Sequence, residues 1–168
     1  MGVDLVYEML AAGKRRRESR DALAAADIRA LPFPANRFDT TWCRLVLGHL
    51  PKLEPAYHEL ARVGVPGGYL IVTDFHAEAM SAGHVRTFRD RAGVLHAVDS
   101  YHHTRRAHEH AAREAGFRLD SAREWTVGPE IKHCYAAATA LDQYERQIGV
   151  PLLLAFRFSK EGGSHRQL

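Results

Sequence analysis

The sequence predicts an α/β fold with a mostly parallel sheet and helices on both faces. From residue 2 onward, strand-like segments alternate with segments of helical periodicity, which is the order that builds parallel sheets. Residues 69 to 73, YLIVT, are apolar as a strand covered on both faces should be. An acid closes three of the predicted strands, at Asp4, Asp27 and Asp74. Ligands of open α/β sheets bind beyond such strand ends, so we expect a site there.

Composition predicts one globular domain and a cytoplasmic location. The chain has 168 residues, of which 46% are hydrophobic, enough for one core. We expect the domain to span residues 1–158, with an inserted lid at about 75–103 and a disordered tail at 159–168. No apolar run approaches the roughly 18 residues of a membrane span, and the start lacks the pattern of a secretory signal. Cys43 and Cys134 are expected to be free thiols.

The net charge of +3 raises the question of nucleic-acid binding, but the charge distribution argues against it. The basic residues between Lys14 and Arg20 form one cluster at a predicted helix end, where cations favour the helix dipole. No aromatic residues are interleaved with them to stack on bases. We therefore expect neither a nucleic-acid partner nor a membrane partner.

The first half of the chain reads as strand, helix, strand, loop and strand. We expect a strand at residues 2 to 5, a helix at 7 to 17 and a short strand at 22 to 28. Pro32 and Pro34 each fix φ and remove a backbone donor, so residues 31 to 36 form a loop. The aromatic and β-branched run from Phe38 to Cys43 then predicts a buried strand.

The second half continues this alternation around one insertion. Pro55 suits the first turn of a helix that the glycines at 64 to 68 end, and Thr104 can cap another helix. Within the insertion, residues 90 to 93 predict a hairpin turn. The remaining predicted elements are strands at 86 to 89, 94 to 98, 117 to 127 and 151 to 158, and one long helix from about 131 to 148.

Six stretches in this order resemble a known family: GVDL at 2 to 5, ADIRALPF at 26 to 33, RFDTTWCRLVLGHL at 37 to 50, ELARVGVPGGYLIVTDFH at 59 to 76, AGF at 115 to 117 and VPLLLAF at 150 to 156. They resemble the class I methyltransferases that use S-adenosylmethionine, of the small-molecule type with a Rossmann-like sheet. The resemblance covers nearly the whole chain. It implies that the cofactor is S-adenosylmethionine and the methyl acceptor a small molecule.

The resemblance implies roles for residues at the strand ends. Asp4 would hold the ribose hydroxyls with Leu5 packed on the adenine, while Asp27 would bond the adenine amino group and Ile28 would cap the ring. Ionised carboxylates accept hydrogen bonds only, which suits hydroxyl and amino donors. The alternative for either acid alone is a helix cap or a solvated strand end. Three further residues match positions that border the methionine part and the methyl group: Cys43, Arg44 and His49.

The family's first strand and glycine-rich turn would lie before Met1, so the resemblance implies a truncated domain with impaired activity. That strand belongs between the strands that begin at Gly2 and Phe38. Its absence would leave two unpaired strand edges, and such edges seek partners. We therefore expect self-association across this gap. Val6 also departs from the family, which often has a small polar residue there to cap the next helix.

Three classes of function remain open. In a methyltransferase, a base could take a proton from the acceptor, because imidazole titrates near neutral pH. The candidates are His49, His76, Tyr101, His102 and His103. A metal site built from His102, His103, His108 and His110 is the second hypothesis, although the five-residue spacing between His103 and His108 does not place them on one helical face. The third is a catalytically inactive binding or assembly module with the same fold.

Overall fold

We describe the protein from a computed structural model, which covers residues 1–14, 23–90 and 92–162. At the N-terminus, β1 (Gly2–Asp4) and β2 (Leu23–Ala25) form a parallel pair, with α1 (Tyr7–Lys14) packed beside them. This confirms the predicted strand, helix and strand order. Most of the predicted basic cluster, from residue 15 to residue 20, lies outside the described residues. No helix in the described part is both long and apolar enough to cross a membrane.

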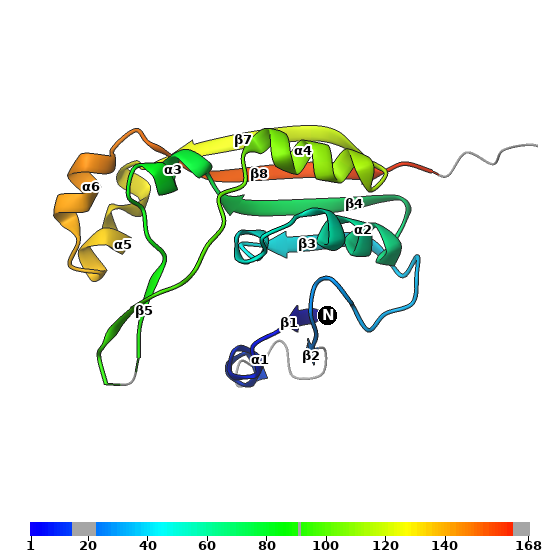
Figure 1. Ribbon diagram of the computed structural model, residues 1–168, viewed down its shortest axis with the longest axis horizontal. Coiled ribbons are helices and arrows are strands. Elements are labelled where there is room, and N and C mark those ends of the chain that lie inside the picture. The colour runs from blue at the N-terminus through cyan, green and yellow to red at the C-terminus, as the bar shows by residue number, and fades with distance from the viewer. Residues whose placement is uncertain (15–22, 91, 163–168) are drawn as a thin grey trace, which may run out of the picture.

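The main sheet has the strand order β3-β4-β8-β7 (Figure 1). Its strands are β3 (Phe38–Arg44), β4 (Gly64–Phe75), β8 (Pro151–Lys160) and β7 (Phe117–Thr126). β3 and β4 are parallel, whereas β8 runs antiparallel to both of its neighbours, β4 and β7. The sheet is therefore mixed. The strands β3, β4 and β7 point in the same direction, whereas β8 is reversed, so the pairing of β3 with β4 is parallel and both pairings of β8 are antiparallel.

Two helices, α2 (Glu54–Val63) and α4 (Arg105–Glu114), cover one face of this sheet (Figure 1). Pro55 occupies the first turn of α2, and the Thr104 hydroxyl caps α4 by accepting a hydrogen bond from the Ala107 amide at 3.2 Å. The core between helices and sheet includes Tyr57, Leu60, Leu70, Val72, Ala111, Leu154, Phe156 and Phe158.

Side chains that alternate with this core point to the other face of the main sheet. Trp42, Tyr69 and Trp125 lie there and are 62%, 47% and 48% exposed. Helices thus cover the face that α2 and α4 pack on, as expected. On the opposite face, where helices were also expected, these three aromatic rings are exposed to solvent.

The predicted insertion contains α3 (Ala77–Ser81) and a two-stranded hairpin of β5 (Thr87–Arg89) and β6 (Leu95–Ala97). Its turn includes Gly93 at a φ of 81°, a conformation that favours glycine. The predicted hairpin is confirmed. In Figure 1 it extends away from the main sheet, and whether it acts as a lid stays a prediction.

The predicted long helix from 131 to 148 is wrong. The chain instead forms a short 3-10 helix (Pro129–Ile131), α5 (Lys132–Ala137) and α6 (Leu141–Gln147). Thr139 has a φ of 57° and ends α5, which lets α6 fold back so that the Tyr135 and Tyr144 rings meet at 5.6 Å. These rings form a small second core with Ala79, Val127 and Leu152.

Two predicted boundaries also shift. The glycines at 64 to 68 end α2 as expected, but they already belong to β4, where Gly68 packs against β3. A Cβ on Gly68 would lie 2.8 Å from the Asp39 carbonyl oxygen, so only glycine fits there. At the other end, β8 continues to Lys160, two residues past the expected domain end. The expected disordered tail lies outside the described residues from residue 163 onward.

Candidate functional site

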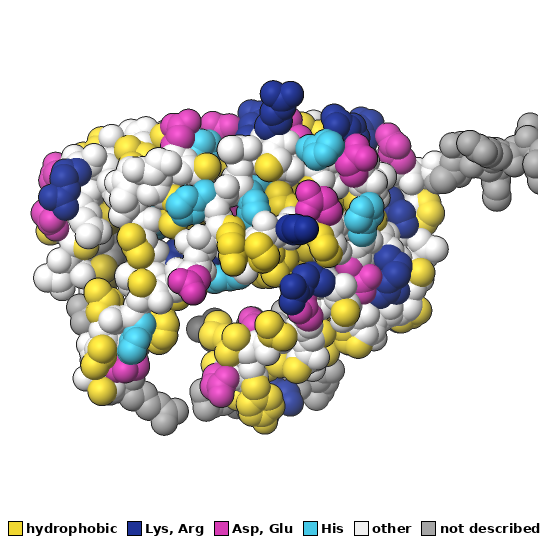
Figure 2. Space-filling model, in the orientation of Figure 1, with side chains coloured by type: hydrophobic (Ala, Val, Ile, Leu, Met, Phe, Trp, Pro, Cys, Tyr) yellow, Lys and Arg dark blue, Asp and Glu magenta, His cyan; other side chains and the backbone are white. Residues whose placement is uncertain are grey.

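A cleft of about 910 Å³ opens between the β1–β2 pair and the main sheet. In Figure 2 a hollow separates the surface over β1 and α1 from the body above it. Within the described residues, β1 pairs with β2 alone and β3 with β4 alone, so each presents an unpaired edge to this cleft. All seven residues that the sequence assigned to cofactor contacts line it: Asp4, Leu5, Asp27, Ile28, Cys43, Arg44 and His49.

Asp4 and Leu5 form the end of one wall. The Asp4 Oδ1 atom accepts a hydrogen bond from the Val6 amide at 2.8 Å, which satisfies a free amide just before α1. The Asp4 carboxylate thus fixes the turn that leads into α1. Its Oδ2 atom makes no hydrogen bond within the described chain. Leu5, the next residue, is 68% exposed and offers an apolar surface to the same cleft.

Asp27 is held by Arg29. Its Oδ1 atom accepts from the Arg29 amide at 2.9 Å, and its Oδ2 atom lies 2.6 Å from the Arg29 Nη2 atom. The hydrogen bonds from the Arg29 side chain lower the pKa of Asp27 to about 2. The carboxylate is therefore ionised at neutral pH and accepts hydrogen bonds only. Ile28, next in the chain, packs against the main core and so ties this wall to the sheet.

The opposite wall is the free edge of β3. Cys43 is buried, and burial, followed by the nearby Asp74 charge, raises the pKa of its thiol to about 12. The thiol is therefore neutral and fills space in the core, so it is not a nucleophile. Arg44 points to the exposed side, with its guanidinium carbon 5.9 Å from the Trp42 ring centre.

A tight loop after β3 carries His49. Leu45 adopts a φ of 55°, and a short 3-10 helix (Leu47–His49) follows. A Cβ on Gly48 would meet the Asp74 Oδ1 atom at 3.0 Å, so the loop packs closely on the end of β4. Burial lowers the pKa of His49, and the Arg86 charge lowers it further. His49 is therefore neutral at pH 7 and able to accept a proton.

The other candidate bases do not line the cleft. His76 is nearly buried, and its Nδ1 atom accepts a hydrogen bond from the Glu78 amide at 3.1 Å, which caps α3. Tyr101 and His102 are exposed, and His103 contacts the Leu50 carbonyl oxygen at 2.8 Å. Of the five side chains named as possible bases, the structure places His49 alone at the cleft.

The four histidines of the metal hypothesis do not converge on one point. The Nδ1 atom of His110 lies 2.9 Å from an Arg113 nitrogen on the exposed side of α4, whereas His108 faces the core. Across residues 1–14, 23–90 and 92–162, no group of three or more His, Cys, Asp or Glu side chains is placed to share a metal ion. The geometry gives the metal hypothesis no support.

A buried polar group beside the cleft was not expected from the sequence. Tyr57 and His108 are fully buried, and the Tyr57 hydroxyl lies 3.0 Å from the His108 Nδ1 atom. The His108 Nε2 atom lies 3.6 Å from the Asp74 Oδ2 atom and has no hydrogen-bond partner among the described residues. The signal was present in the sequence, because Ala111 and Ala112 follow His108 at helical spacing and predict a face that includes it.

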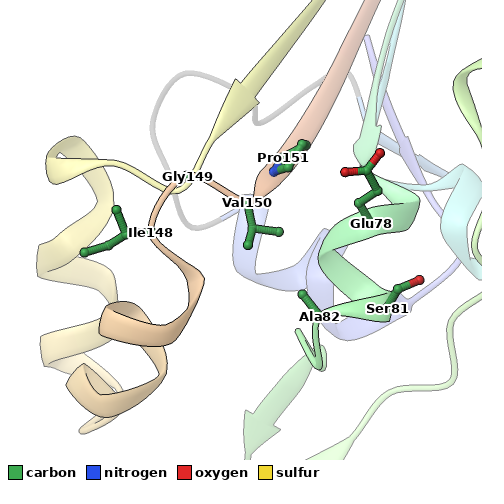
Figure 3. A pocket seen from close by; sticks show the side chains of 7 residues that line it. All are labelled: Glu78, Ser81, Ala82, Ile148, Gly149, Val150 and Pro151. Carbon is green, nitrogen blue, oxygen red and sulfur yellow. The ribbon is translucent and has the colours of Figure 1, made fainter.

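A second hollow of about 670 Å³ lies between α3 and the turn that leads into β8 (Figure 3). Glu78 and Ser81 are the polar side chains among its lining residues, and both come from α3 (Figure 3). It contains none of the predicted site residues. The cleft beside β3 therefore remains the candidate site.

Comparison with known proteins gives both a family and a set of relatives. Residues 1–72 match the family described as a methyltransferase domain. A malonyl-acyl-carrier-protein O-methyltransferase from Enterobacter lignolyticus is 36% identical over 78 residues, which make up 46% of this chain and 31% of that protein. A demethylmenaquinone methyltransferase from Thermus thermophilus is 37% identical over 78 residues, 45% of this chain and 36% of that protein. The match thus spans about a third of the length of these relatives.

Solved structures share the fold over nearly the whole chain. An S-adenosylmethionine-dependent methyltransferase from Mesorhizobium loti has a TM-score of 0.66 at 17% identity, covering 95% of this chain and 79% of that one. The cyclase SpnF has a TM-score of 0.65 at 20% identity, covering 96% and 66%. Residues 1–72 thus match a methyltransferase domain, and nearly the whole chain shares the fold of solved S-adenosylmethionine-dependent methyltransferases.

Proposed function

We propose that the cleft between β1 and β3 binds S-adenosylmethionine and that the protein transfers its methyl group to a small-molecule acceptor. The observation that carries this proposal is the gathering of side chains from three strand ends into one cleft. The demethylmenaquinone methyltransferases among the relatives, named for a small-molecule acceptor, support the acceptor class. The cytoplasmic location expected from the sequence stays a prediction.

Each wall of the cleft has a distinct part in this proposal. Asp4 and Asp27 bind the hydroxyl and amino groups of adenosine, and Leu5 and Ile28 pack on its ring. S-adenosylmethionine supplies an electrophilic methyl group bonded to sulfur. His49, neutral at pH 7, takes the proton that the acceptor loses. The walls otherwise act by aligning the reactants and excluding water.

The unpaired strand edges argue that this site is incomplete in the chain as described. Backbone groups on the facing sides of β1 and β3 have no ladder partner within the described residues, and the space between them is open. Bound S-adenosylmethionine would therefore lack support between the two walls. We propose that S-adenosylmethionine binds weakly to this chain and that catalysis is impaired.

An inactive binding module is the alternative, and SpnF, named a cyclase, shows that this fold is not limited to proteins named for methyl transfer.

Calorimetric titration with S-adenosylhomocysteine tests the site. We expect measurable but weak binding, which Asp27→Asn and Asp4→Asn each reduce by at least about tenfold through loss of charge-assisted bonds. Asp142→Asn, on the exposed side of α6, is the control and should leave binding unchanged. Binding that survives both site substitutions would refute the adenosine assignment. No binding at millimolar ligand would favour the inactive module, and low-micromolar binding would refute the proposed impairment.

We also propose that the protein self-associates through the surface around the gap. The unpaired edge of β3 and the exposed Trp42 ring beside it support this. The alternative, direct closure of the gap by pairing of β1 with β3, is not the arrangement found.

A further inference from the structure

One loop joins the two walls of the cleft. β1, β2 and α1 make their main contacts with one another, and residues 26–37 lead from β2 to β3. Pro32 and Pro34 deprive this loop of two amide donors, so it cannot hold itself by a regular hydrogen-bond ladder. The placement of the first wall therefore depends on what holds this loop from outside.

An ion pair on α2 holds the loop by its backbone. The Glu59 Oε1 atom accepts a hydrogen bond from the Leu31 amide at 2.6 Å. Arg62 donates to the Leu31 carbonyl oxygen from Nη2 at 3.0 Å and to the Phe33 carbonyl oxygen from Nη1 at 2.8 Å. The Arg62 guanidinium also donates two hydrogen bonds to the Glu59 carboxylate, from Nε to Oε2 at 2.8 Å and from Nη2 to Oε1 at 2.7 Å. The Arg62 carbonyl oxygen also accepts from the Asn36 amide at 2.9 Å.

These contacts link the core helix to both sides of the site. Leu31 and Phe33 line the cleft, and they follow Asp27 and Ile28 in the same wall. The helix that carries the ion pair packs on the main sheet, whose edge forms the opposite wall. We infer that Glu59 and Arg62 are positioning residues, which fix the wall that carries Asp27 at its distance from β3. The inference rests on the proposed function only for the identity of the ligand.

The same two residues contribute little to the main core. The side of α2 that packs on the sheet bears Ala56, Tyr57, Leu60 and Val63, all buried. The side chains of Glu59 and Arg62 are 13% and 38% exposed and reach out to the loop. The Arg62 hydrogen bonds lower the pKa of Glu59, so the pair is ionised at neutral pH. Substitution of Arg62 should therefore release the loop without unfolding the sheet.

The test compares Arg62→Met, which keeps the aliphatic stem, with Arg62→Lys, which keeps the charge but not the planar fork. Arg146→Met is the matched control, because Arg146 also pairs with an acid on its own helix, at 2.9 Å, but on α6. Hydrogen exchange measured by mass spectrometry compares the exchange rate of residues 23–37 with the rates of β4 and β8. Calorimetry with S-adenosylhomocysteine reports on the site.

For Arg62→Met we expect exchange in residues 23–37 to rise at least about tenfold, with exchange in β4 and β8 unchanged and only a small fall in the melting temperature. Affinity for S-adenosylhomocysteine should fall at least about tenfold, and Arg62→Lys should recover part of both effects. Exchange in residues 23–37 that matches the Arg146→Met control would overturn the inference. If that segment loosens but neither wild type nor variant binds the ligand, the positioning role stands and the proposed function fails.

Discussion

At the scale of single residues, the buried His108 has the largest consequence for stability. Its ring is fully buried between Tyr57, Asp74, His103 and Phe156. Burial, with a smaller electrostatic contribution from His103, lowers the pKa of His108 to about 3. The neutral tautomer with its proton on Nε2 lets the Tyr57 hydroxyl donate to Nδ1 and aims the Nε2 proton at Asp74. Protonation would place a charge in the core.

We expect His108 to make the protein sensitive to mild acid. Its pKa in the folded protein lies below the value of 6.5 for the free side chain, so the unfolded chain takes up the proton first. The stabilisation is complete above about pH 6.5 and is lost as the pH falls toward 3, at up to about 1.4 kcal/mol per pH unit. His108→Asn keeps an acceptor for Tyr57 and should flatten this dependence in urea unfolding.

The test uses the difference in pH dependence between wild type and His108→Asn, because Asp74, present in both, acts in the opposite direction. Burial raises the pKa of Asp74, so its folded form gains stability from protonation. Tyr57→Phe serves as the control that removes the hydroxyl but keeps the imidazole. An equal pH dependence in wild type and His108→Asn would rule out His108 as the source.

The sequence predicted the position of a site residue correctly where that residue follows a strand. Asp4 and Asp27 end strands, and the parallel arrangement brings strand ends to one edge, so both acids line the cleft as expected. Their chemical roles stay predictions. His76 and Tyr101 were candidates by type alone, and type does not reveal that one caps a helix and the other lies away from the cleft.

At the scale of elements, the break between α5 and α6 shows how a local conformation overrides periodicity. The Thr139 amide donates to the Ala136 carbonyl oxygen at 3.0 Å, and the Ala140 amide donates to the Tyr135 carbonyl oxygen at 2.9 Å. This is the pattern of a helix end with a left-handed residue, a place usually taken by glycine. The apolar spacing from 131 to 148 continued through it, so the sequence predicted one helix.

A β-branched residue in a left-handed conformation is strained, so Thr139→Gly should stabilise the protein. The gain should be about 0.5–1 kcal/mol, after the added freedom of glycine in the unfolded chain is subtracted. Thr139→Val keeps the branched side chain and should bring no gain. Chemical denaturation of the three proteins measures this, and a loss of stability in Thr139→Gly would show that the Thr139 side chain outweighs its strain.

Other element boundaries depended on contacts between distant segments. The strand at 69 to 73 was visible from its apolar run, yet β4 begins at Gly64 because that end pairs with Phe38 across a bulge. Pairing partners that lie 26 residues apart leave no local pattern. The capped helices and the hairpin, by contrast, follow from Thr104, Pro55 and Gly93, whose signals are local.

At the scale of the whole molecule, the main sheet and the small β1–α1–β2 part lie on either side of an open cleft (Figure 1). The loop of residues 26–37, which Glu59 and Arg62 bind, connects them. The alternation of strands and helices predicted this fold, and the similar solved structures confirm it. It did not predict the open sheet face with Trp42, Tyr69 and Trp125, because an apolar strand residue looks the same whether a helix covers it or not.

Within the part of the chain that the structure describes, β3 ends the main sheet with an unpaired edge, and Trp42 is exposed on this strand. We therefore expect the protein to self-associate at micromolar concentration. Light scattering should give a mass above that of the monomer, 18.8 kDa, and the mass should rise with concentration. Trp42→Lys places a charge next to the β3 edge and should shift the equilibrium toward monomer, since a charge on an edge strand opposes pairing. Tyr7→Lys, an equally exposed aromatic position on α1, is the matched control. A monomer at all concentrations, or equal masses for both variants and wild type, would show that this edge does not mediate association.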